Sequence, residues 1–122
     1  KYPKMKIEDL ESKLKMEIQF NELKSISSRY LLKKYIVMYP EAKFIMIIIK
    51  ELLKSRELDQ VDTGGMNSYS LTLLVISYFQ DILKSPGNHE LLLSEHLLNF
   101  LSLYGNKFNY KLLGITIRSG GC

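Results

Sequence analysis

The chain has 122 residues, of which 46% are hydrophobic and 25% charged, a composition typical of one globular domain with a core of its own. The longest apolar run, residues 44–49, is far shorter than the roughly 20 residues that a membrane-spanning helix needs, so we expect no membrane contact. A single cysteine, Cys122, excludes an internal disulfide and a cysteine-based zinc site. The net charge of +4 suits a polyanionic partner but does not require one.

Two short segments near the start of the chain, residues 2–8 and 13–20, alternate between apolar and polar residues. This period is that of a half-buried β-strand. The polar segment 8–12 between them has the composition of a turn, so the pattern predicts a β-hairpin. Its apolar positions are Met5, Ile7, Leu14, Met16, Ile18 and Phe20.

The rest of the chain predicts four helices, over residues 25–38, 41–56, 67–83 and 89–104. Pro40 suits the first turn of the second helix, and the middle of that helix is apolar on all sides, so we expect it to be the most buried element. A strand over residues 45–49 is the competing interpretation. Residues 113–118 alternate as a short strand. The fold class is therefore mostly α.

Few of the residues belong to a catalytic pattern that spacing alone can identify. His89 and His96 are not four apart, as a zinc-protease helix requires, so we expect both on the surface. The sequence contains neither a nucleophile elbow nor a Walker phosphate loop. Lys50 and Lys54 share a helical face shortly before Gly64-Gly65 and a helix start, and together these groups could bind a polyphosphate. On spacing alone, a solvated helix edge explains the two lysines equally simply and is the commoner case.

Longer segments resemble the Trf-type nuclear poly(A) polymerases, also called DNA polymerase sigma. Residues 3–7 and 14–21 resemble the family's "PIIK" and "VDISFN" strands, and residues 50–58 resemble its "K-Q-F-L-x-x-R-x-L-N" helix. Residues 63–71, TGGMNSYSL, resemble "TGGIGSYSL", and residues 103–121 resemble "ELYGRxFNY…GIRIxxGG". These segments occur in the family's order over nearly the whole chain.

The resemblance implies a hairpin remnant of the catalytic domain at residues 1–21 and a helical central, PAP-associated domain at residues 22–122. In this family three carboxylates hold two metal ions, Mg²⁺ or Mn²⁺, that align an RNA 3′ hydroxyl with a nucleoside triphosphate. ATP is the implied substrate, and polyadenylation for nuclear RNA surveillance is the implied function. A cytoplasmic location is the alternative. A zinc-knuckle RNA-binding protein and a helicase are the implied partners, in a TRAMP-like complex.

The resemblance also implies roles for single residues. Glu17 stands at the third metal-binding carboxylate, where the family has aspartate, and is the implied catalytic residue. The implied nucleotide-binding residues are Lys50, Lys54 and Ser68 for the phosphates, Tyr69 for the base, and Ser28 and Arg29 for the ribose.

Other interpretations remain open at this stage. The family's first two carboxylates would precede this region, and the chain begins with Lys1, so we expect a fragment that is inactive alone. Within the same class, a terminal uridylyltransferase is the alternative. Glu17 in place of aspartate would also suit a catalytically inactive RNA- or protein-binding scaffold. The plainest alternative is a helical interaction module without a nucleotide site.

Overall fold

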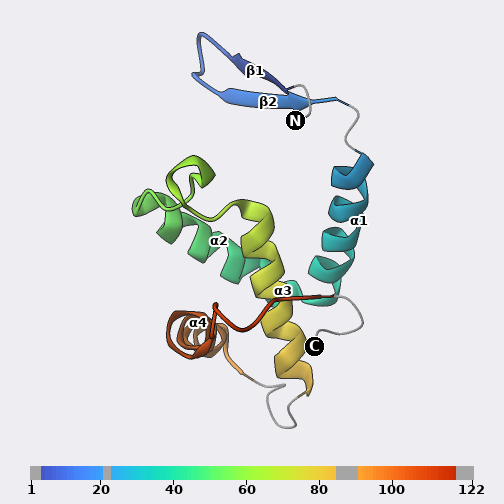
Figure 1. The fold of residues 1–122 in the computed structure, drawn as a ribbon, viewed down its shortest axis with the longest axis vertical. Coiled ribbons are helices and arrows are strands. Elements are labelled where there is room, and N and C mark those ends of the chain that lie inside the picture. Colours follow the sequence, from blue (N-terminus) through green and yellow to red (C-terminus); the bar gives the residue numbers. More distant parts are fainter. Residues whose placement is uncertain (1–3, 21–22, 85–90, 118–122) are drawn as a thin grey trace. The chain divides into compact units, whose positions relative to one another are not determined.

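The computed structural model describes residues 4–20, 23–84 and 91–117. Its regular elements are one two-stranded antiparallel sheet and four α-helices, which confirms the mostly helical fold class (Figure 1). The chain divides into two compact units, residues 1–33 and 34–122, which are described separately below. The predicted domain boundary between residues 21 and 22 lies outside the described residues and stays a prediction. No helix among the described residues is long and apolar enough to cross a membrane.

The first unit begins with the predicted hairpin, formed by β1 (Lys4–Glu8) and β2 (Lys15–Gln19). The strands pair antiparallel, with Met5 opposite Ile18 and Ile7 opposite Met16. The turn between them is held by Asp9, whose carboxylate accepts a hydrogen bond of 2.8 Å from the backbone N–H of Ser12. Hydrogen bonds from the side chain and backbone of Ser12 lower the pKa of the Asp9 carboxyl.

Alternation gives the hairpin one polar and one apolar face, because successive side chains of a strand point to opposite sides. The polar face pairs Lys6 with Glu17 and Glu8 with Lys15 across the strands. The opposite face holds the four paired apolar residues, which are between 38% and 53% exposed. Glu17 therefore lies on the face away from Met16 and Ile18 and is exposed.

Helix α1 (Leu23–Met38) follows the hairpin, and α2 (Pro40–Ser55) begins two residues after α1 ends. Pro40 occupies the start of α2, where its missing N–H would have no intrahelical partner in any case. Glu41 in the first turn and Lys54 in the last turn complement the helix dipole. Both helices match their predicted ranges closely.

Helix α2 ends in a Schellman motif that uses an unusual residue. The Leu58 N–H donates to the Leu53 carbonyl at 2.8 Å, and the Glu57 N–H donates to the Lys54 carbonyl at 3.1 Å. Glu57 adopts the left-handed conformation that this motif requires, with φ of 58°. Glycine is the usual residue there because a Cβ atom makes that conformation unfavourable.

We expect Glu57→Gly to stabilise the protein by up to about 1 kcal/mol, because it removes the Cβ penalty at this position. Glu57→Ala keeps a Cβ atom and removes the same carboxylate, so it is the matched control and should give no such gain. Urea denaturation of the two variants checks this. An equal gain in both would attribute the effect to the lost charge.

The core of the second unit is built around α3 (Ser68–Lys84), which corrects the prediction that residues 41–56 would be the most buried. Only Ala42, Ile45 and Ile49 of α2 are buried, whereas Ile47 is 53% and Ile48 42% exposed. Helix α3 buries seven residues, Leu71, Leu74, Val75, Ile76, Tyr78, Phe79 and Gln80. Residues 45–49 form part of helix α2 and not a strand. The side of the helix that carries Ile47 and Ile48 is exposed.

Aromatic rings connect α3 to α4 (Leu93–Ser102) and to the π-helical turn Leu103–Lys107 that continues it. Tyr78 meets Phe100 edge to face with centroids 5.7 Å apart, and Phe100 lies 5.0 Å from Tyr104. Burial raises the pKa of Tyr78 to about 12. The prediction of a surface position was wrong for His96, which is buried with its Nδ1 atom 3.3 Å from the Tyr78 hydroxyl. His89 lies outside the described residues.

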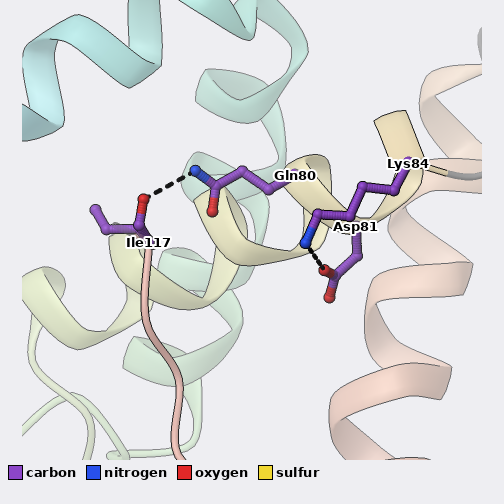
Figure 2. Close-up of polar contacts among 4 residues, drawn as sticks. All are labelled: Gln80, Asp81, Lys84 and Ile117. Carbon is purple, nitrogen blue, oxygen red and sulfur yellow. Dashed lines mark hydrogen bonds and ion pairs between the residues drawn. The ribbon is translucent and has the colours of Figure 1, made fainter. Parts of the chain in front are cut away.

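The C-terminal segment forms no strand over residues 113–117, the described part of the strand predicted at 113–118. It runs across α3 (red in Figure 1). The carbonyl of Ile117, which a strand would use in a ladder, instead accepts from the Gln80 amide at 3.1 Å (Figure 2). It also accepts from the Tyr35 hydroxyl at 2.8 Å. Side-chain donors from two helices thus replace a strand partner.

Candidate nucleotide-binding site

The loop of residues 57–66 joins the end of α2 to the start of α3 and folds back on itself. The Met66 N–H donates to the Leu58 carbonyl at 2.8 Å, and the Gly65 N–H donates to the Gln60 carbonyl at 2.7 Å. Between these two pairs lies a short 3₁₀ turn, Val61–Thr63. The closed loop therefore fixes the first turn of α3 relative to the last turn of α2.

Two glycines make this closed loop possible, each for a different reason. Gly64 ends the 3₁₀ turn with φ of 86°, a conformation that favours glycine. A Cβ atom on Gly65 would lie 2.7 Å from the Gln60 carbonyl oxygen and would also collide with the Leu58 carbonyl group. The Gly64-Gly65 pair is thus required by backbone geometry.

The start of α3 carries Ser68 and Tyr69. Asn67 caps the helix, since its Oδ1 atom accepts from the Ser70 N–H at 2.7 Å. Ser68 is exposed in the first turn, where helix N–H groups point outward and favour anions. Tyr69 is 44% exposed, so part of its ring is available to a ligand.

Lys50 and Lys54 are both exposed, one turn apart on α2. Lys54 lines an open pocket over the C-terminal end of α2 and the following loop, together with Arg56, Glu57, Asp59, Gln60 and Thr63. Lys50 and Ser68 do not line this pocket, so their convergence with Lys54 on one ligand stays a prediction. Arg56 was not among the predicted site residues, although it matches the arginine of the family's "K-Q-F-L-x-x-R-x-L-N" motif.

Three further predicted residues belong to the first unit. Glu17 is exposed on β2, and on α1 Ser28 is half-buried and Arg29 exposed. A carboxylate suits Mg²⁺ or Mn²⁺, but Glu17 supplies one ligand where the family uses three. The described residues contain no group of three or more His, Cys, Asp or Glu side chains that could hold a metal ion. Glu17 alone therefore does not complete a metal site.

Comparison with known proteins shows what the chain is similar to in sequence and fold. Residues 92–122 match the family model described as Cid1 family poly A polymerase. The chain is 35% identical to poly(A) RNA polymerase CID14 of Cryptococcus neoformans over 98% of its length. It is also 34% identical to the inactive non-canonical poly(A) RNA polymerase protein Trf4-2 of Drosophila melanogaster, again over 98%. The chain is homologous to the Trf4 and Cid14 poly(A) polymerases.

This homology confirms the Trf-type resemblance that the sequence motifs indicated. The chain spans 16% of the length of CID14 and 31% of Trf4-2. Its fold matches the solved polymerase core of TRAMP, an RNA surveillance complex, with a TM-score of 0.83 and 24% identity. That match covers 99% of this chain and 39% of the solved one. The Trf-type fold therefore extends over both the hairpin and the helices.

Proposed function

We propose that the chain is the nucleotide-gripping part of a template-independent RNA nucleotidyltransferase that adds AMP to RNA 3′ ends. The observation that carries this proposal is the closed loop of residues 57–66. Its geometry requires Gly64 and Gly65, and it holds Ser68 and Tyr69 at a fixed place after the lysine-bearing end of α2.

Each predicted residue has a role that its chemistry supports. The ammonium groups of Lys50 and Lys54 neutralise the triphosphate, and Ser68 donates hydrogen bonds to it from the start of α3. Tyr69 stacks on the incoming base, a contact worth roughly 1–3 kcal/mol per base elsewhere. Ser28 and Arg29 contact the ribose. When bound, Mg²⁺ or Mn²⁺ would activate the RNA hydroxyl and stabilise pyrophosphate, with Glu17 as one ligand.

The setting of the whole protein is part of the same proposal. ATP is its substrate and the RNA 3′ end the acceptor. We infer a nuclear location and a TRAMP-like complex with a zinc-knuckle RNA-binding protein and a helicase. The solved TRAMP polymerase core, whose fold this chain shares, supports the TRAMP-like complex in general.

In the full-length protein, Lys50→Ala should lower kcat/KM for ATP by about tenfold or more, because a charge paired with phosphate is lost. Lys43→Ala is the matched control, since it removes an exposed lysine from the first half of the same helix. Steady-state tailing kinetics at varied ATP measure both. An unchanged kcat/KM in Lys50→Ala would show that this lysine is only part of the solvated edge of α2 and does not bind ATP.

A catalytically inactive scaffold is the second candidate function. Glu17 in place of the family's aspartate favours it, as does the similarity to Trf4-2, which is named as inactive. Tailing assays of the full-length protein with ATP and Mg²⁺ or Mn²⁺ separate the two functions. RNA binding without extension in either metal would favour the scaffold.

A further inference from the structure

Helix α1 carries an excess of positive charge that the proposed nucleotide site does not explain. Four of the chain's 17 Lys and Arg residues lie in α1 and none of its 13 Asp and Glu residues does. The remainder of the chain therefore holds equal numbers of basic and acidic residues. The whole net charge of +4 is located in this one helix of 16 residues.

Within the first unit, three side chains of α1 form an exposed basic and aromatic face, Arg29, Tyr30 and Lys33. Positions 29 and 33 are one turn apart, and all three residues fall within an arc of roughly 100° on a helix with 3.6 residues per turn. The Tyr30 side chain is 77% exposed, and both cations are exposed. No acidic side chain in the described part of the chain forms an ion pair with Arg29 or Lys33.

Cations that form no ion pair with a described residue, beside an exposed aromatic ring, suit single-stranded nucleic acid. Cations follow the phosphate backbone, and aromatic rings stack on bases whatever their identity. An acidic protein partner would use the charges but would gain little from a ring positioned for stacking. The absence of acidic residues from α1 also means that no like charge repels a phosphate chain along the helix.

We propose that this face of α1 binds the single-stranded body of the RNA, upstream of the 3′ end being extended. The inference rests on the proposed function and adds a contact surface to it. Arg29 is also the proposed ribose contact, so this residue belongs to both proposals. Tyr30 and Lys33 continue the face along the helix, outside the residues that grip ATP. The binding is independent of base sequence, because phosphates and stacking carry no base code.

The test measures binding of a fluorescently labelled oligo(A) to the full-length protein by anisotropy, over a range of salt concentrations. Tyr30→Ala should weaken binding by roughly tenfold, and Tyr30→Phe should bind as the unsubstituted protein does, because stacking needs only the ring. Lys33→Ala should weaken binding and make the slope of log K against log salt shallower by roughly 0.7, the value for one phosphate contact on a single strand. The KM for ATP should stay unchanged in the Tyr30 and Lys33 variants.

Lys111→Ala is the control for charge alone, since it removes an exposed lysine from another part of the chain. A slope change in Lys111→Ala as large as in Lys33→Ala would overturn the inference, because the effect would then be one of overall charge. Wild-type affinity in both Tyr30→Ala and Lys33→Ala would also overturn it, while leaving the proposed function in place. Failure of the unsubstituted protein to bind RNA at all would overturn both.

Discussion

Glu17→Ala in the full-length protein should abolish tailing while leaving the fold unchanged. If the proposed function is correct, this substitution removes one of the carboxylates that hold the catalytic metal. Glu17 is exposed, so its loss should change the free energy of unfolding by no more than about 0.5 kcal/mol. Tailing assays, circular dichroism and Mn²⁺ binding followed by electron paramagnetic resonance measure the three effects.

The polar face of the hairpin offers a matched control. Glu8→Ala removes another exposed carboxylate from the same face, opposite Lys15, and should preserve both tailing and Mn²⁺ affinity. Glu17→Asp restores the residue of the family motif and should keep or raise activity. Tailing that survives Glu17→Ala, with unchanged Mn²⁺ affinity, would show that this carboxylate does not hold the metal.

Gly65→Ala should be the most damaging single substitution in the loop of residues 57–66. The new Cβ atom meets backbone carbonyl groups of Leu58 and Gln60, which a rotamer change cannot move aside. We expect a loss of about 3 kcal/mol, the upper part of the usual range for overpacking. In a unit of this size, that loss would lower Tm by roughly 10–20 °C. Thermal unfolding by calorimetry measures it.

Gly64→Ala is the matched control for Gly65→Ala. It measures the cost of an unfavourable backbone conformation where no steric collision occurs. A Cβ atom on Gly64 meets nothing within 4 Å, so only the unfavourable φ of 86° opposes alanine there. That penalty is about 1–2 kcal/mol. A loss in Gly65→Ala no larger than in Gly64→Ala would mean that the loop moves to accept the side chain, and that its closure does not constrain the start of α3.

Local patterns predicted the elements of this fold better than its burial. Pro40, Asn67 and the alternation of residues 2–20 act within a few residues, so the helix starts and the hairpin could be predicted from them. Burial depends on which side of a helix other elements cover. Ile47 and Ile48 are as apolar as Ile45, yet they are exposed, because α3 and α4 pack against α2 where Ala42, Ile45 and Ile49 are buried. Conversely, His96 is polar in isolation but is buried beside the rings of Tyr78 and Phe79.

For the candidate site, too, the sequence predicted local features but not their arrangement in space. The family motif identified the Gly-Gly loop, and the structure supplies its physical cause in the carbonyl groups packed against Gly65. The motif also contained an arginine at position 56, but its place in the pocket with Lys54 depends on how the Schellman turn directs the chain after α2. A sequence pattern cannot show that direction, because it depends on Glu57 adopting a left-handed conformation that glutamate usually avoids.

The two hydrogen bonds accepted by the Ile117 carbonyl affect how the second unit unfolds locally. One acceptor serves two donors on different helices, Tyr35 of α1 and Gln80 of α3. If residues 113–117 detached while α3 stayed folded, the buried Gln80 amide would lose its only hydrogen bond among the described residues. The cost would be about 1–3 kcal/mol. Release of this segment is therefore coupled to exposure of α3, so that residues 113–117 and the helix form one cooperative unit of local unfolding.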